Sequence, residues 1–181
     1  MRAFIAVDLS PLPALESVLK ELNEIKGVKA VEPSTLHITL KFLGDTEERL
    51  SPTISDIMRE AVYEIEPFEV EISGGGAFPE KGPARVIWAG IQGGNSLQII
   101  ARRLEEKCAA LGFPREDRGF KAHLTLARIK DPRASKQARE VVEKISCSHF
   151  GKKKVEEIVL KKSVLRPQGP DYFDVLKVRF S

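Results

Sequence analysis

The same four-residue pattern, His-x-Thr-Leu, occurs once in each half of this 181-residue chain. It occupies His37–Leu40 and again His123–Leu126. Both copies lie in apolar, β-prone runs, where successive side chains point to opposite faces of a strand. The histidine and the threonine of each copy therefore share one face, and the two aliphatic residues share the other. Two imidazoles, each with a neighbouring hydroxyl, suit paired acid–base chemistry on one substrate.

Around the two copies, the expected strands and helices follow one another in the same order. Apolar runs of β-prone residues predict strands, and apolar stripes with helical spacing that end at glycine predict helices. In the first half these elements are a strand at 2–9, a helix ending at Gly27, the motif strand at 36–43, a helix at 47–65, and a strand at 68–73 that leads into turns at 74–83. In the second half they are a strand at 85–91, a helix ending at Gly112, the motif strand at 120–129, a shorter helix at 135–145, and a terminal strand pair at 155–165 and 172–180.

The repeated order predicts a single domain over residues 1–181 that is built from two similar units, roughly 1–83 and 84–181. No stretch rich in proline or serine separates these units, so we expect two pseudo-symmetric lobes packed together rather than independent domains. An approximate two-fold relation between the lobes would bring the two motif strands face to face across a cleft.

The composition limits the class of protein. Hydrophobic residues make up 42% of the chain and charged residues 30%, as in soluble globular proteins. No apolar run approaches the roughly 20 residues that a membrane span needs, and the apolar N-terminal stretch is short and interrupted by Asp8. We therefore expect a cytoplasmic protein. Few Asn and Gln beside many Lys and Glu favour a thermophilic source, and the net charge of +3 suits a polyanionic partner without requiring one.

Other kinds of catalytic site fit the sequence less well. Zinc ligands usually occur as closely spaced His or Cys pairs, and neither motif histidine has such a partner nearby. A G-x-S-x-G nucleophile elbow and the glycine patterns of phosphate-binding loops are missing, so the glycines at 74–76 and 93–94 are interpreted as turns. The third histidine, His149, has no matching motif and is interpreted as a surface residue. We predict no metal and no cofactor.

Two histidines and two threonines without a metal suit displacement at a phosphodiester. One neutral imidazole takes a proton from the attacking hydroxyl or water, and the other, as imidazolium, gives a proton to the departing oxygen. In-line displacement requires the two rings on opposite sides of phosphorus. Thr39 and Thr125 are expected to hydrogen-bond the non-bridging oxygens. An ordinary pKa near 6.5 allows either histidine to take either role near neutral pH.

Longer stretches around these motifs make the chain resemble the two-histidine (2H) phosphoesterases, specifically the RNA 2′,3′-cyclic phosphodiesterase family that is also called 2′-5′ RNA ligase. The resemblance covers essentially the whole chain. It rests on four segments, 2–9 (RAFIAVDL), 36–44 (LHITLKFLG), 120–128 (FKAHLTLAR) and 163–172 (SVLRPQGPDY). Ala122 stands where the family commonly has proline, which changes the entry into the strand but not the chemistry.

The resemblance implies an α+β fold of two lobes, with antiparallel sheets lining a central cleft and helices outside. It also implies hydrolysis of RNA 2′,3′-cyclic phosphate ends to 2′-phosphomonoesters, with His37 as proton donor and His123 as proton acceptor. Arg128 matches the family's Leu-Ala-Arg ending. It is expected to contact phosphate, which requires a twist or bulge in the strand, or else to be an exposed arginine at the strand end. Lys41, two residues beyond Thr39, is expected on the histidine face, either adding positive potential for the substrate or simply solvated.

Ligation follows from the same chemistry when a 5′-hydroxyl replaces water, which gives a 2′-5′ linkage. Because water is present at about 55 M, hydrolysis is the expected main activity and ligation a reversible side reaction. The expected partner is RNA with 2′,3′-cyclic phosphate ends, such as tRNA fragments, and the expected state is a monomer. Two alternatives stay open: a nucleotide- or RNA-binding module with little turnover, and a cyclic phosphodiesterase that acts on a small nucleotide.

Overall fold

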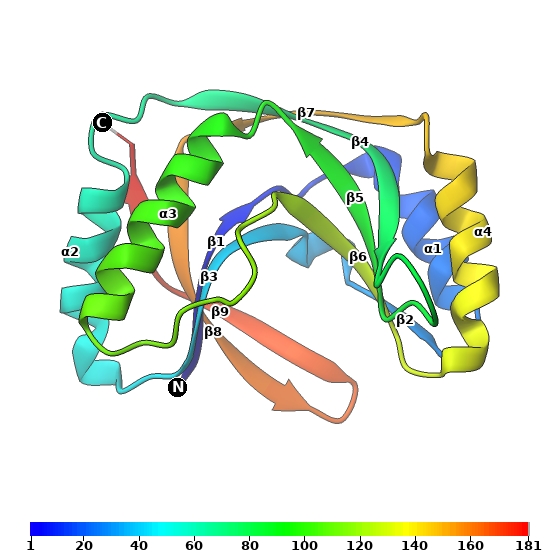
Figure 1. The fold of residues 1–181 in the computed structure, drawn as a ribbon, viewed down its shortest axis with the longest axis horizontal. Coiled ribbons are helices and arrows are strands. Elements are labelled where there is room, and N and C mark those ends of the chain that lie inside the picture. Colours follow the sequence, from blue (N-terminus) through cyan, green and yellow to red (C-terminus); the bar gives the residue numbers. More distant parts are fainter. Residues whose placement is uncertain (181) are drawn as a thin grey trace.

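The computed structural model describes residues 1–180, which form two antiparallel β-sheets, each covered by a pair of helices (Figure 1). The strands are β1 (Arg2–Asp8), β2 (Val28–Ala30), β3 (His37–Asp45), β4 (Phe68–Phe78), β5 (Val86–Gln92), β6 (His123–Ile129), β7 (His149–Val155), β8 (Glu157–Arg166) and β9 (Gly169–Arg179). The helices are α1 (Glu16–Glu24), α2 (Ser51–Ala61), α3 (Asn95–Ala110) and α4 (Ser135–Ile145). The expected α+β class with antiparallel sheets is confirmed.

The two sheets have matching strand orders. The first sheet runs β3-β1-β8-β9 and the second β2-β6-β5-β4-β7, with all neighbouring strands antiparallel. When β3 is matched with β6, the remaining strands correspond in order: β1 with β5, β8 with β4, and β9 with β7. The additional strand β2 lies at the edge beside β6. Each motif strand therefore has an equivalent neighbour in its own sheet, as the expected two-fold relation requires.

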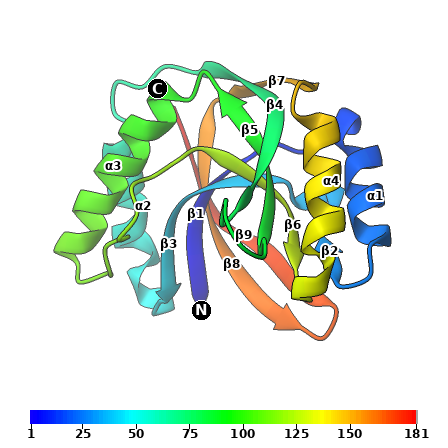
Figure 2. The ribbon, with the colours of Figure 1, turned by 45° about the vertical axis from the view of Figure 1, so that its right-hand side comes forward.

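Neither lobe is made from one half of the sequence. We call the first sheet with α2 and α3 the first lobe, and the second sheet with α1 and α4 the second lobe (Figures 1 and 2). The first lobe takes β1, β3 and α2 from the N-terminal half of the chain but α3, β8 and β9 from the C-terminal half. A cut between residues 83 and 84 would leave both sheets incomplete, so the two halves of the sequence depend on each other for folding.

Three strand segments differ from the expectations. β2 and β7 were not expected, because β2 has only three residues and β7 (sequence HFGKKKV) is rich in lysine, so neither shows a clear apolar alternation. β4 continues to Phe78, so the prediction of turns from Gly74 onward is wrong for residues 74–78. The glycines there are strand residues that allow close packing against β5, as described below.

The aliphatic residues of both motifs lie in the hydrophobic core. Ile38 is 1% exposed, Leu40 5%, and Leu124 and Leu126 0%. The alternation predicted for the two motif strands is therefore confirmed over these residues. Within residues 1–180, no helix is long and apolar enough to span a membrane.

A close contact in the second sheet supports Phe78, which lies beside His123. Gly76 on β4 pairs with Trp88 on β5, and a Cβ atom at position 76 would come within 2.3 Å of the indole ring. Trp88 in turn stacks on Phe78, with 5.2 Å between the ring centroids. Only glycine leaves room for the indole in this place.

Replacing Gly76 with alanine is expected to lower the free energy of unfolding by about 1–3 kcal/mol, because the added methyl group overpacks against Trp88. Urea denaturation measures the change. Gly119→Ala is the matched control, since a Cβ atom there has no neighbour within 4 Å. Equal stabilities of the two variants would contradict the contact described here.

Candidate active site

The two motif histidines are anchored in the same way. His37 begins β3 and His123 begins β6. The Nδ1 atom of His37 is 2.7 Å from the Thr35 carbonyl oxygen, and Nδ1 of His123 is 2.8 Å from the Lys121 carbonyl oxygen. A carbonyl oxygen only accepts, so Nδ1 carries the hydrogen and donates it in both rings. The Nε2 atom is left free in each ring to accept or release a proton.

Aromatic side chains hold the planes of both imidazoles. The ring of His37 lies 5.2 Å from that of Phe4 and 5.3 Å from that of Tyr172, the latter edge to face. The ring of His123 meets Phe78 edge to face at 5.5 Å. Together with the Nδ1 hydrogen bonds, these contacts restrict the rotation of each ring, so both Nε2 atoms are presented in a defined direction.

Each motif strand contains a β-bulge at the leucine that ends the motif. In the β1–β3 ladder, Ala6 pairs with Thr39 and the next residue, Ile5, pairs with Lys41, so Leu40 is the extra residue. In the β5–β6 ladder, Leu126 is the extra residue between Thr125 and Ala127. A bulge moves the following side chains to the opposite face from the one that strict alternation predicts.

The bulge in β6 places Arg128 on the same face as His123. Leu126 and Ala127 are both buried, and the exposed Arg128 follows them. The bulge that this placement requires is therefore present. Whether Arg128 contacts phosphate stays a prediction. At the equivalent position of β3, five residues after His37, the exposed residue is Phe42.

The bulge in β3 has the reverse effect on Lys41, and the prediction that Lys41 lies on the histidine face is wrong. Lys41 is 2% exposed and points under α3. Its ammonium group donates to the Pro114 carbonyl at 2.7 Å and is 2.9 Å from a carboxylate oxygen of Glu105. Glu105 also accepts from the backbone N–H of Glu116 at 2.8 Å. Lys41 therefore anchors the loop that leads to β6 and is not available to a substrate.

Arg128 connects the two motifs. It lies on β6, yet its charge adds to the effect of burial in lowering the pKa of His37 on β3. Burial raises the pKa of Tyr172, and the charge of Arg128 offsets part of that rise. β3 and β6 approach each other closely between the sheets. The structure thus brings the end of the second motif to the histidine of the first.

The surroundings of His37 favour its neutral form. Burial lowers the pKa of His37 below its ordinary value of 6.5, and the charges of Lys161 and Arg128 act in the same direction. The hydrogen bond to the Thr35 carbonyl and the carboxylate of Asp8 offset part of this effect. At neutral pH the free protein therefore carries His37 as neutral imidazole.

Tyr172, Asp8 and Lys161 were not expected beside His37 from the sequence, although all three contact or act on its ring. Lys161 had a recognisable signal, because it continues the buried apolar run Ile158–Leu160 of β8. A lysine in such a run indicates a paired buried charge. His149 is exposed, as expected, and its Nδ1 atom is 2.8 Å from Glu71 Oε1.

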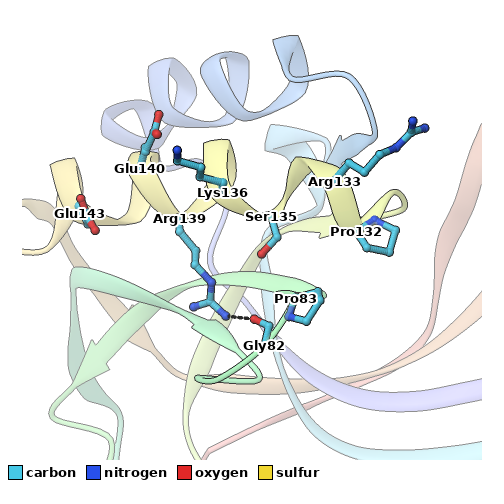
Figure 3. A pocket seen from close by; sticks show the side chains of 9 residues that line it. All are labelled: Gly82, Pro83, Pro132, Arg133, Ser135, Lys136, Arg139, Glu140 and Glu143. Carbon is cyan, nitrogen blue, oxygen red and sulfur yellow. Dashed lines mark hydrogen bonds between the residues drawn. The ribbon is translucent and has the colours of Figure 1, made fainter.

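A surface cavity of about 660 Å³ lies away from these residues, between the β4–β5 loop and α4 (Figure 3). Two of the three basic side chains that line it, Arg139 and Arg133, are bound within the protein. Arg139 donates to the carbonyls of Pro79 at 2.8 Å and Gly82 at 2.7 Å, and Arg133 pairs with Asp131. Among residues 1–180, no three His, Cys, Asp or Glu side chains are grouped as metal ligands.

Comparisons with known sequences agree with the motifs. The family model described as the 2′-5′ RNA ligase superfamily matches residues 11–160. An RNA 2′,3′-cyclic phosphodiesterase of Archaeoglobus fulgidus is 42% identical over 177 residues, which cover 97% of this chain and 98% of that protein. One of Methanothermobacter thermautotrophicus is 36% identical over 180 residues, covering 97% and 96%. Relatives of this kind come from thermophiles, in agreement with the composition.

Comparisons with solved structures agree with the fold. The crystal structure of TT0787 from Thermus thermophilus matches with a TM-score of 0.83 at 30% identity, covering 99% of this chain and 98% of that one. Escherichia coli LigT in complex with 3′-AMP matches with a TM-score of 0.73 at 21% identity, with the same coverage. The second likeness concerns the fold alone.

Lys41→Met is expected to lower the free energy of unfolding by about 1–3 kcal/mol, because it leaves the Glu105 carboxylate and the Pro114 carbonyl without their buried partner. Urea denaturation measures the loss. The control is Lys20→Met on the exposed face of α1, which is expected to change stability by less than about 0.5 kcal/mol. A Lys41→Met variant as stable as the control would contradict the buried anchor.

His37 is expected to titrate with a midpoint below 6.5 in the free protein. NMR spectra recorded against pH measure this midpoint, and the His37→Gln variant identifies the resonance. Because the unfolded chain binds this proton at a higher pH than the folded chain, the same shift removes stability as the pH falls below about 6.5. A midpoint at or above 6.5 would show that burial of the ring does not lower the pKa of His37.

Proposed function

The chain belongs to the 2′-5′ RNA ligase superfamily, and we propose that it hydrolyses RNA ends carrying a 2′,3′-cyclic phosphate to 2′-phosphomonoesters. The observation that carries this proposal is the pair of imidazoles, each anchored through Nδ1 to a backbone carbonyl and each free at Nε2. The RNA 2′,3′-cyclic phosphodiesterase of Archaeoglobus fulgidus, similar over nearly its whole length, supports the choice of substrate.

In the proposed reaction the two histidines act on opposite sides of one phosphorus atom. Nε2 of His123 takes a proton from water while the water oxygen bonds to phosphorus. The bond between phosphorus and the 3′ oxygen breaks, and Nε2 of His37 gives its proton to that oxygen. The phosphate stays on the 2′ oxygen. Both proton transfers are supplied by the protein, so we propose that the reaction is independent of metal.

His37 is neutral in the free protein, so it can act as the proton donor only if it gains a proton when the substrate binds. The cyclic phosphate carries a negative charge, and that charge beside Nε2 favours the imidazolium form against the effects of Lys161 and Arg128. Once protonated in a site that disfavours the charge, the ring is a stronger acid than an ordinary imidazolium. It then transfers its proton readily to the departing oxygen.

Three further side chains are proposed to bind the phosphate. Thr39 and Thr125 lie two residues beyond the histidines on the same strand faces and are partly exposed, so their hydroxyls can donate to the non-bridging oxygens. Arg128 reaches the histidine face through the bulge and supplies a charged donor. The phosphate is thereby held between the two imidazoles.

Ligation is proposed as a side activity of the same site. A 5′-hydroxyl that takes the place of water attacks the cyclic phosphate, the 3′ oxygen leaves, and a 2′-5′ phosphodiester forms. Water at about 55 M competes unless a bound RNA end gives the hydroxyl a high effective molarity. Both histidines come from one chain, so a monomer is sufficient for either reaction, and fragments such as cleaved tRNA are suitable substrates by chemistry.

The purified protein is expected to convert an oligonucleotide ending in 2′,3′-cyclic phosphate to the 2′-phosphate in the presence of EDTA. His37→Ala and His123→Ala are each expected to lower kcat about 10²- to 10⁴-fold, since each removes one proton transfer. Product analysis by chromatography and a discontinuous rate assay measure both effects. His149→Ala, a substitution of an exposed histidine, is the matched control.

The result that would overturn this proposal is specific. A 3′-phosphate product would show that the bond from phosphorus to the 2′ oxygen breaks instead of the bond to the 3′ oxygen. Loss of turnover in EDTA would show that the two imidazoles are not sufficient for the reaction. Tight binding of a 2′-phosphorylated nucleotide without turnover of any cyclic phosphate would identify a binding module instead.

A further inference from the structure

Lys161 on β8 is a lysine whose ammonium group is enclosed by two carboxylates. Its side chain is 10% exposed, and Nζ is 3.0 Å from Asp8 Oδ1 and 2.7 Å from Asp174 Oδ1. Burial by itself lowers the pKa of Lys161, but the hydrogen bonds to Asp174 and Asp8 raise it above its ordinary value. The ammonium group is therefore charged throughout the pH range in which histidine titrates.

Side-chain contacts link the three charged groups across the first sheet toward His37, although the backbone partner of Lys161 on β1 is Phe4 and not Asp8. Asp174 on β9 pairs directly with Lys161 on β8, and Asp8 on β1 pairs directly with His37 on β3. The contact between Lys161 and Asp8 joins these two pairs. Each strand of the sheet thus contributes one charged or titratable group, in the order β9, β8, β1, β3.

A gain in stability does not by itself explain why these three charged groups are present. Burying the ammonium group of Lys161 is costly, and the two carboxylates that offset this cost are themselves 37% (Asp8) and 41% (Asp174) exposed. Replacing a buried charge and its partners with well-packed apolar residues is often neutral or stabilising. Ile158, Val159 and Leu160 precede Lys161 and are all fully buried, so an apolar residue at 161 would continue the core. An apolar residue at position 161 would, however, supply no positive charge near the imidazole of His37.

We propose that Lys161 is a positioning residue for proton transfer at His37: it fixes the Asp8 carboxylate, places a permanent positive charge near the ring, and so sets the pH at which the ring gains its proton. This inference depends on the proposed function only for the part that this proton plays in turnover. The effect on the ring itself is a property of the free protein.

Charges of both signs act on the His37 ring from the elements packed around it. Lys161 of β8 and Arg128 of β6 disfavour the imidazolium, and Asp8 of β1 favours it. The uncharged ring of Tyr172 on β9 lies against the imidazole. Because Lys161 and Asp8 are bound to each other and act in opposite senses, removing one exposes the ring to the other. A purely structural role for the pair does not predict opposite effects.

The test measures the NMR titration midpoint of His37 in four variants of the full chain. Lys161→Met is expected to raise the midpoint, because the positive charge is lost and Asp8 is left unpaired. Asp8→Asn is expected to lower it, and the double variant is expected to return close to the original midpoint. Lys161→Arg keeps the charge and is expected to keep the midpoint. The pH limb of kcat/KM on a cyclic phosphate is expected to move in the same direction in each variant.

Lys162→Met is the matched control, since the next residue on β8 points to the opposite face, where it lies 5.8 Å from the Phe173 ring centroid. It is expected to leave the His37 midpoint unchanged. Shifts of the same sign in Lys161→Met and Asp8→Asn, or none in either, would overturn the inference. If Lys161→Met does not fold, Asp8→Asn and Lys161→Arg decide it. If the midpoints move as expected in a protein without turnover, the inference stands and the proposed function fails.

Discussion

An extra residue at the end of each motif decides which of the next side chains face the histidines. Leu40 in β3 and Leu126 in β6 are both accommodated as β-bulges at equivalent places in the two sheets. Before the bulge, alternation places the histidine and the threonine on the same face of the strand. After the bulge, each side chain lies on the face opposite to the one that strict alternation assigns. Arg128 is thereby brought to the histidine face, and Lys41 is turned into the core beneath α3. The chemistry available at the site depends on this local departure from regular strand geometry.

The exchange of elements between the lobes has a related consequence. β1 pairs with β3 in the first sheet, although α1 and β2, which connect them, belong to the second lobe. The loop before β6 is in turn held by Lys41 of β3 through the Pro114 carbonyl. Each histidine strand is therefore fixed in part by residues of the other half of the sequence. These shared anchors restrain the two motif strands and favour a preorganised site.

Electrostatics around His37 are balanced rather than uniformly positive. Burial, Lys161 and Arg128 disfavour a proton on the ring, while the Asp8 carboxylate and the Thr35 carbonyl favour one. In the proposed function, an anionic phosphate beside the ring would favour the imidazolium form. The two anchored imidazoles are similar in geometry but lie in different surroundings, which gives a physical basis for two different roles.

The sequence by itself determined the repeated motif, the strands that carry it, the helices between them and the pairing of histidine with threonine on one face. These follow from alternation and helical spacing, which act over a few residues. It did not determine the place of Lys41 or the involvement of Tyr172, Asp8 and Lys161. Those depend on the partner strand: a bulge exists only relative to the strand opposite, and a buried charge becomes tolerable only when tertiary contacts supply its partners. The sequence repeat likewise indicated two similar units, but strand pairing between the halves decided how the lobes are assembled.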